Sequence, residues 1–209
     1  MKIYRLAGYK IVYHVTDKDF SEIGGNSGLG IHVAKDKSSA LKFASEWYSK
    51  SPFYVMQFAM NMTNPLKTPD LGMFNSPSRF LSYLWDEQII TDEEYLELAR
   101  KFGASDQSIP TDYDDYDQMG QRDDYSLSGG KAPIEFNAED TVFLQKEGLP
   151  YEDWETVRQL LKKKGYDGLE YENRVDANGT CYVVFYPSQL ILIGKKYYSS
   201  AIELELELH

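Results

Sequence analysis

The chain has 209 residues, a length typical of one domain that carries an insertion. A hydrophobic content of 42% allows a core, and a net charge of −11 opposes nonspecific binding to nucleic acid or to anionic membranes. A single cysteine, Cys181, rules out an internal disulfide. No signal peptide opens the sequence and no apolar run approaches the ~18 residues of a membrane span, so a cytoplasmic location is expected.

The first third of the chain alternates strand and loop signals and contains one helix. Strands are expected over 2–6 and 9–13, and four glycines between 24 and 30 predict a loop. Apolar residues at helical spacing over 36–50 predict a helix with Asp36 at its N-cap. A mostly apolar run over 53–62 predicts a buried strand, which Thr63-Asn64-Pro65-Leu66 ends.

The middle of the chain combines one helix with a long acidic loop, whereas the end combines one helix with three strands. A helix is expected over 91–103, where Thr91 and Glu94 form a capping box, and an acidic loop over 104–138. A second helix within 150–168 ends at Gly165, and strand signals follow at 168–172, 181–186 and 189–194. The alternating tail, 201–209, suits an edge strand and receives no functional role. Strands at both ends with helices between them predict an α+β fold with a mostly antiparallel sheet.

Several common types of site are excluded by spacing. The glycines of GNSGLG (25–30) do not match the dinucleotide fingerprint, and neither a phosphate loop nor a Gly-x-Ser-x-Gly elbow is present. The three histidines, His14, His32 and His209, lack metal-ligand spacing, so no metal site is expected. The acidic run 112–117 lacks the spacing of a calcium loop and is typical of a solvated loop. A histidine at a strand end, such as His14, is by itself most often just a polar residue.

Six segments in a fixed order carry more information than any one of them. They are YHVT (13–16), SGLGIHVA (27–34), TNPL (63–66), GYDG (165–168), YEN (171–173) and CYVVFYPSQ (181–189). Together they resemble the ADP-ribosyltransferase domains of phage and mobile-element polyvalent proteins. The string DANGTCY (176–182) is also similar to a strand entry in ADP-ribosylating anti-CRISPR proteins. The resemblance spans 12–67 and 154–194 and leaves out the region from about 73 to 145.

The resemblance implies a fold and an activity. It implies a single domain over 1–209, with a split antiparallel sheet, peripheral helices and a large acidic insertion at about 73–145. It also implies an NAD-dependent mono-ADP-ribosyltransferase of phage or bacterial origin. Such an enzyme modifies a host macromolecule, most simply a host protein, in the bacterial cytoplasm. Transfer from NAD passes through an oxocarbenium-like state, which a nearby carboxylate stabilises.

The same resemblance assigns the residues that contact NAD. His14 matches the histidine that hydrogen-bonds the ribose next to adenine, a task that suits a neutral imidazole. Val15 replaces the glycine of the family signature, and its backbone amide remains available to the nicotinamide amide. The remaining expected NAD contacts are Thr16, Gly28, Gly30, His32, Tyr48 and Tyr54. Tyr48 fits the protein core equally well.

The catalytic carboxylate is the hardest residue to choose. The resemblance favours Asp176, where many family members carry the longer glutamate, and a displaced carboxylate is costly. A turn-forming role ahead of Asn178-Gly179 explains Asp176 equally simply. Glu172, which shares a strand face with Glu170, is the second choice. Gln189 and the Tyr166-Asp167 pair fit structural roles.

Three other functions stay open at this stage. Water as the acceptor would make the protein an NAD glycohydrolase. Val15 and the shorter acid at 176 also fit a catalytically inactive binding protein of the same fold. A third alternative is an acidic inhibitor that blocks a partner with the insertion, over 104–130, as its working surface.

Overall fold

The computed structural model describes residues 8–19, 28–49, 51–70, 77–101, 153–174 and 176–200. The expected strand at 2–6, the acidic loop at 104–138 and the tail at 201–209 lie outside these residues. Within them, no helix is long and apolar enough to cross a membrane.

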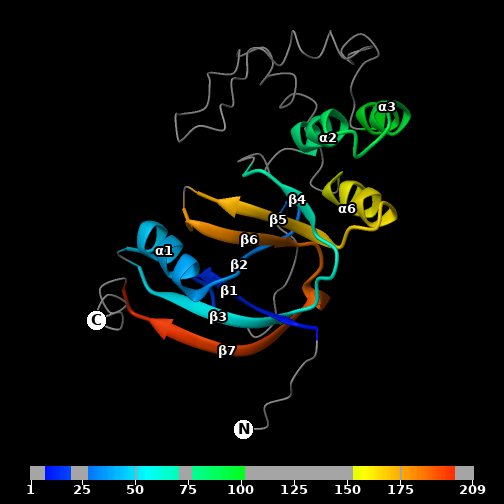
Figure 1. The fold of residues 1–209 in the computed structure, drawn as a ribbon. Coiled ribbons are helices and arrows are strands. Elements are labelled where there is room, and N and C mark those ends of the chain that lie inside the picture. Colours follow the sequence, from blue (N-terminus) through cyan, green and yellow to red (C-terminus); the bar gives the residue numbers. More distant parts are fainter. Residues whose placement is uncertain are drawn as a thin grey trace, which may run out of the picture. The chain divides into compact units, whose positions relative to one another are not determined.

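A seven-stranded sheet forms the centre of the fold, in the order β4-β5-β6-β2-β1-β3-β7 (Figure 1). Neighbouring strands are antiparallel except for the parallel pair β4–β5. The α+β class expected from the sequence is therefore confirmed. The strands are β1 (Lys10–Thr16), β2 (Ile31–Ala34), β3 (Phe53–Met60), β4 (Leu66–Thr68), β5 (Gly168–Asn173), β6 (Gly179–Val184) and β7 (Leu190–Tyr198).

The strand ends differ from the expected ones where a backbone turn intervenes. β6 stops at Val184, because Tyr186 leads into a short 3-10 turn over Pro187–Gln189. β7 continues to Tyr198, four residues beyond the expected end, because it pairs with the full length of β3. A local turn therefore sets the end of β6, and long-range pairing sets the end of β7.

Contacts within the chain divide it into two compact units, Met1–Gly72 with Arg158–His209, and Met73–Val157. The second unit contains α2 (Pro77–Asp86), which the sequence analysis missed, and α3 (Asp92–Lys101). The expected capping box begins α3, because Thr91 N–H donates to Glu94 and Glu94 N–H donates to Thr91 Oγ1, at 2.9 and 3.2 Å. The division falls within α6 (Asp153–Lys163), which ends as expected at Gly165, a residue with φ of 91°.

Helix α1 (Lys37–Trp47) belongs to the first unit and contacts β1, β2 and β3. It buries Ala40, Leu41 and Ala44. Asp36 occupies the N-cap position, as expected, but its side chain makes no capping hydrogen bond. A separate core cluster is built from strand residues, namely Val12, Ile31, Val33, Met56, Phe58, Met60, Met62, Tyr182 and Val184.

Asp167 fastens the turn at 63–66 to the turn after α6. Its carboxylate accepts hydrogen bonds from Thr63 N–H, Thr63 Oγ1 and Asn64 N–H at 2.6, 2.8 and 2.9 Å. Gln189 Nε2 donates to the Asp167 carbonyl at 2.7 Å, which adds the start of β7. Three segments of the sequence resemblance, TNPL, GYDG and PSQ, thus meet in one structural junction, in agreement with the structural roles expected for Asp167 and Gln189.

Replacing Asp167 by alanine should destabilise the fold. Three donors lose a charged acceptor, and hydrogen bonds of this kind are worth about 2 kcal/mol even after competition with water. We expect the free energy of urea-induced unfolding to fall by about that amount. Asp36→Ala is the matched control, because the Asp36 side chain makes no cap bond, and its effect should stay within about 0.5 kcal/mol. Equal effects of the two substitutions would contradict the structural role of Asp167.

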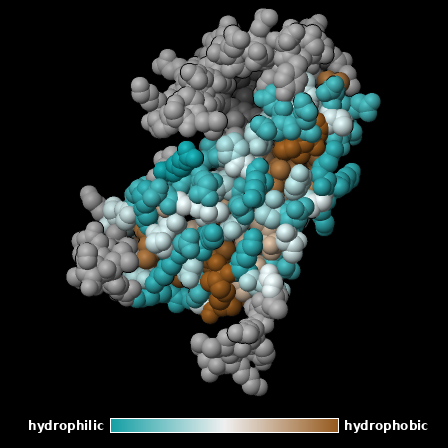
Figure 2. Space-filling model, viewed as in Figure 1, coloured by the Kyte–Doolittle hydropathy of each residue, from teal (hydrophilic) through white to brown (hydrophobic). Residues whose placement is uncertain are grey.

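An apolar patch lies over the strands β1, β3 and β7 (Figure 2). Exposed residues of these strands include Ile11, Ile191, Ile193 and Tyr197. Ile11 and Ile191 flank Ala59 of β3, since both are its cross-strand partners, and Ala59 is fully buried. The patch therefore covers Ala59 of β3, beside the edge strand β7.

Candidate functional site

The backbones of strands β1 and β2 pair at a single position, and the side chain of His14 connects the two strands next to that position. The pair is Tyr13↔Ala34, whereas β1 pairs with β3 along its whole length. Next to the pair, Nδ1 of the His14 side chain lies 2.8 Å from the carbonyl oxygen of His32. A carbonyl only accepts, so Nδ1 carries the proton and Nε2 is the basic nitrogen of the His14 ring. The imidazole thus links the two strands where their backbone pairing ends.

His32 continues the connection to the other half of the sheet. Its Nδ1 lies 3.0 Å from the Tyr171 hydroxyl, and the two rings meet edge to face with centroids 6.1 Å apart. Tyr171 is on β5, which β6 separates from β2. His14, His32 and Tyr171 therefore form a hydrogen-bonded series across the sheet, which we call the His–His–Tyr chain.

Both histidines of this chain are neutral at physiological pH. Burial lowers the pKa of His14, although its bond to the His32 carbonyl acts in the opposite direction. Burial, with a smaller effect from His14, lowers the pKa of His32 to about 4. The His32 side chain also keeps exposed surface, so its ring retains part of its hydration. Neutral imidazoles can donate one hydrogen bond and accept another, which suits a ligand with hydroxyl groups.

Tyr171 and Cys181 are also held in their neutral forms. Burial raises the pKa of Tyr171, and the charges of Asp70 and Asp176 add to the effect. Burial raises the pKa of the Cys181 thiol to about 12, and the charges of Asp70, Glu172 and Asp176 add to the effect. A thiol with this pKa is not a thiolate at neutral pH, so Cys181 is not a nucleophile. The same data place two carboxylates, Asp70 and Asp176, within electrostatic reach of Tyr171.

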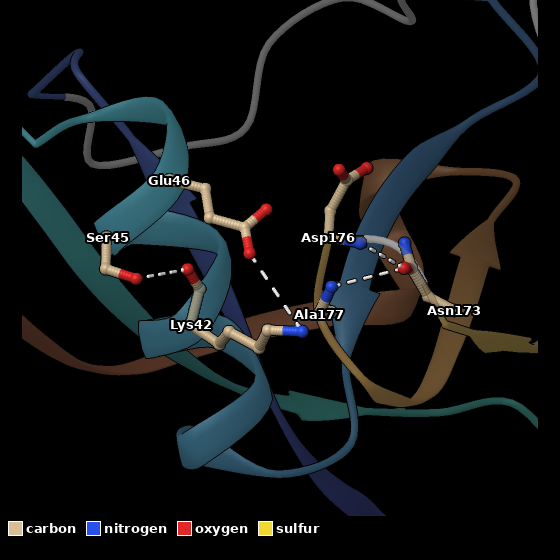
Figure 3. Close-up of polar contacts among 6 residues, drawn as sticks. All are labelled: Lys42, Ser45, Glu46, Asn173, Asp176 and Ala177. Atoms are coloured by element: carbon tan, nitrogen blue, oxygen red, sulfur yellow. Dashed lines mark hydrogen bonds and ion pairs between the residues drawn. The ribbon is translucent and has the colours of Figure 1, made fainter. Parts of the chain in front are cut away.

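Asp176 belongs to the turn between β5 and β6. Its backbone N–H and that of Ala177 donate to Asn173 Oδ1, at 2.9 and 3.1 Å, and Asn178 adopts a left-handed φ of 53°. The turn-forming alternative is thus present in the structure, but it uses the backbone of Asp176 and not its side chain. The Asp176 carboxylate points away from the Asn173 amide (Figure 3).

The turn that carries Asp176 lies beside helix α1. A Cβ on Gly179 would come within 2.4 Å of Ser39 Oγ, so the start of β6 packs directly on the start of the helix. Figure 3 shows the turn next to α1, where Lys42 and Glu46 form an ion pair at 3.9 Å. This packing fixes the position of the turn against the sheet.

Glu172, the second candidate carboxylate, lies on the other face of β5 from Tyr171, because neighbouring residues in a strand alternate. It accepts a hydrogen bond from Thr180 Oγ1 at 2.7 Å. Burial raises the pKa of Tyr182, which shares this face, and the charges of Glu170, Asp36 and Glu172 add to the effect. The charge of Asp176 acts on Tyr171 and Cys181, and that of Glu172 acts on Cys181 and Tyr182, so both carboxylates lie within electrostatic reach of this part of the sheet.

Four other predicted contacts lie outside the His–His–Tyr chain. Val15 and Thr16 are buried in β1, and Thr16 Oγ1 accepts from Lys18 N–H at 3.1 Å. The half-buried Tyr48 ring packs on the buried Phe53 with centroids 5.9 Å apart. The Tyr54 ring packs on Tyr197 at 5.2 Å.

The predicted glycines lie on the approach to His32. Gly28 has a left-handed φ of 66°, and its carbonyl accepts from Arg158 at 2.8 Å. Gly30 packs so closely on β6 that a Cβ would lie 2.3 Å from the Val184 carbonyl oxygen. Both glycines therefore shape the backbone that leads into β2, and any contact with a ligand would be made by that backbone.

Three residues of this region were missed by the sequence analysis. Tyr171 was quoted only as part of the YEN segment, and Asp70 and Arg158 were not considered. The alternation of β5 places Tyr171 on the opposite face from Glu170 and Glu172, but no local signal says that its hydroxyl reaches His32. Arg158 and Asp70 become relevant only through tertiary contacts.

A pocket of about 670 Å³ is lined by residues of β1, β5 and β6 and of the chain that leads from β2 into α1, and none of the predicted site residues line it. Its walls carry charges of both signs and two tyrosines; the lining residues are Lys10, Ile11, Tyr13, Lys35, Asp36, Lys37, Glu170, Thr180 and Tyr182. His14 and His32, the two histidines expected to contact NAD, are held together by a hydrogen bond, apart from this pocket. In the described part of the chain, no three His, Cys, Asp or Glu side chains are grouped to hold a metal ion.

Acid should destabilise the fold through the two histidines. Their pKa is near 6.5 in the unfolded chain and lower in the folded one, so the unfolded chain binds more protons below pH 6.5. The stability is complete above pH 6.5 and is lost as the pH falls from 6.5 towards about 4. We expect urea unfolding to show a falling free energy between pH 7 and 5. The double variant His14→Asn, His32→Gln should flatten this dependence, and an unchanged slope would contradict the assignment.

Comparisons with known proteins add one distant structural likeness. No family model matches the chain, and no curated protein matches it. Among solved structures, a chain of the crystal structure of the M. tuberculosis MbcT–MbcA toxin–antitoxin complex is similar, at 11% sequence identity and a TM-score of 0.40. The likeness covers 96% of this chain and 90% of that chain. Similarity at this level identifies neither a family nor an activity.

Proposed function

We propose that this protein is an NAD-dependent mono-ADP-ribosyltransferase. The observation that carries the proposal is the His–His–Tyr chain: His14 and His32, which were expected to contact NAD, are joined by one hydrogen bond and are both neutral. The order of sequence segments that resembles ADP-ribosyltransferase domains, from which both histidines were assigned to NAD, also supports it. The acceptor is proposed to be a host protein, and the net charge of −11 favours one with a basic surface.

The residues present fit NAD as a substrate. His14 keeps its Nδ1 proton on the His32 carbonyl and so offers Nε2 as an acceptor for a ribose hydroxyl. The backbone of Val15 and of the Gly28–His32 segment is proposed to hold the nicotinamide side. The Tyr171 hydroxyl fixes the His32 ring through Nδ1.

Asp176 is proposed to supply the carboxylate for the reaction. In the transfer, the bond between the nicotinamide nitrogen and the ribose C1′ breaks, and nicotinamide leaves with the electron pair. The acceptor nucleophile bonds to C1′ and gives up its proton to solvent. Positive charge on the ribose peaks between these events, and a carboxylate held nearby favours that state over the ground state. The Asp176 side chain points away from the turn that its own backbone forms, so the carboxylate is not used in that turn (Figure 3).

Labelled NAD tests the proposal directly. The purified protein is incubated with NAD labelled in the adenylate and with a bacterial lysate, and proteins are analysed by mass spectrometry for added ADP-ribose. A labelled protein supports the transferase. Free ADP-ribose without labelled protein would indicate a glycohydrolase. If calorimetry with millimolar NAD shows no binding, and a host protein is captured tightly instead, the inactive binding protein replaces the enzyme.

A further inference from the structure

Arg158 is a buried arginine that holds the backbone ahead of His32. It lies on α6 with 5% of its surface exposed. Its Nη1 donates to the carbonyl oxygens of Gly28 and Leu29, at 2.8 and 3.1 Å. A guanidinium carries several donors in a fixed plane, so one side chain can hold two successive carbonyls. The Tyr186 ring flanks the group, with its centroid 6.0 Å from the Arg158 Cζ.

The held segment has little freedom to move elsewhere. Gly30 packs against the Val184 carbonyl with no room for a Cβ, and Ile31 is already paired with Val184 in the sheet. The backbone from 28 to 31 is therefore fixed on one side by the arginine and on the other by β6. His32 is the next residue, and it supplies both a carbonyl to His14 and a ring nitrogen to Tyr171.

We infer that Arg158 is a positioning residue for the His–His–Tyr chain, acting through the Gly28–Leu29 backbone to set where His32 meets its two partners. The inference deepens the proposed function and rests on it for its consequence in NAD use. The simpler explanation is that Arg158 only ties α6 to the sheet. If Arg158 is a positioning residue, replacing it displaces the His32 imidazole in a protein that stays folded. If it only ties α6 to the sheet, the imidazole keeps its position in such a variant.

The variants are Arg158→Met, which keeps the length and removes the donors, and Arg158→Lys, which keeps the charge but not the planar group. Lys162→Met is the matched control. Lys162 lies one turn further along α6 and also stands over the Tyr186 ring, at 5.7 Å, but is exposed to solvent. Near-ultraviolet circular dichroism establishes which variants are folded.

Imidazole NMR signals report on positioning without NAD. The sequence has three histidines, so the signals of His14 and His32 are assignable by single replacement of each. We expect Arg158→Met to shift the signals of both, Arg158→Lys to shift them less, and Lys162→Met to leave them in place. Folded variants whose imidazole signals match the wild type overturn the inference. If neither Arg158 variant folds, the role of Arg158 is folding alone, and the inference is equally overturned.

Steady-state kinetics separate this inference from the proposed function. We expect Arg158→Met to raise KM for NAD about 10-fold, because misplacement of a binding group on a sub-ångström to ångström scale has effects of 10–100-fold. Shifted imidazole signals in a protein whose wild type does not use NAD would leave the positioning role intact and remove the proposed function. If the wild type uses NAD but the imidazole signals of the folded Arg158→Met variant are unshifted, the proposed function stands and the positioning role is overturned.

Discussion

Asp176→Asn is expected to lower the rate of ADP-ribosyl transfer by about 100-fold or more, since removal of one electrostatic group aimed at a charged transition state typically costs that much. The substitution keeps the size of the side chain. It also keeps the backbone N–H that donates to Asn173, so the turn between β5 and β6 is retained. The loss should appear in kcat and not in KM, because the carboxylate acts on charge that develops only in the reaction.

Two other carboxylates make this experiment specific. Glu46→Gln is the control, because Glu46 lies on α1 beside the turn in Figure 3 and pairs with Lys42 at the surface. It should leave the rate unchanged. Glu172→Gln removes the second candidate, which is bound to Thr180 on the other face of β5, and should have only a small effect. The reverse result, a large loss with Glu172→Gln and a small one with Asp176→Asn, would move the catalytic role to Glu172.

The helices and most strands of the described chain follow from local residue patterns. Spacing of apolar residues predicts α1, α3 and α6, and Thr91 with Glu94 form the expected capping box. The pattern for α2 is also present, with Pro77 at its start and Phe80, Leu81, Leu84 and Trp85 buried, and was overlooked. In contrast, β4 has three residues, and its partner β5 lies about a hundred positions further along the chain. No local signal predicts a strand of that kind.

The site is only partly visible in the sequence for the same reason. His14 and His32 stand in segments with a recognisable order, so both were selected. Their hydrogen bond depends on where β1 and β2 cease to pair, which is set by the whole sheet. Arg158 lies on a helix whose sequence pattern is amphipathic, and an arginine on such a helix normally faces solvent. Its burial against the Gly28 and Leu29 carbonyls is a tertiary feature that residue spacing does not encode.

Replacing His14 separates its structural bond from its proposed contact with NAD. An asparagine at this position carries an amide N–H close to where Nδ1 lies, so His14→Asn should keep the bond to the His32 carbonyl. It has no counterpart of Nε2. His14→Ala removes both groups and leaves the carbonyl without this partner, at a cost of about 1–2 kcal/mol. We therefore expect His14→Asn to unfold near the wild-type urea concentration and His14→Ala to unfold earlier.

NAD affinity should respond differently from stability. Loss of the Nε2 acceptor removes one hydrogen bond to the ribose and leaves a ribose hydroxyl without its partner, which weakens binding about 10–100-fold. Both variants should show this loss in calorimetry, although only His14→Ala is destabilised. Full NAD affinity in His14→Asn would mean that the ring acts solely as a bridge between β1 and β2. In that case the neutral imidazole, on which the proposed contact with NAD depends, would be a consequence of packing and would have no part in substrate binding.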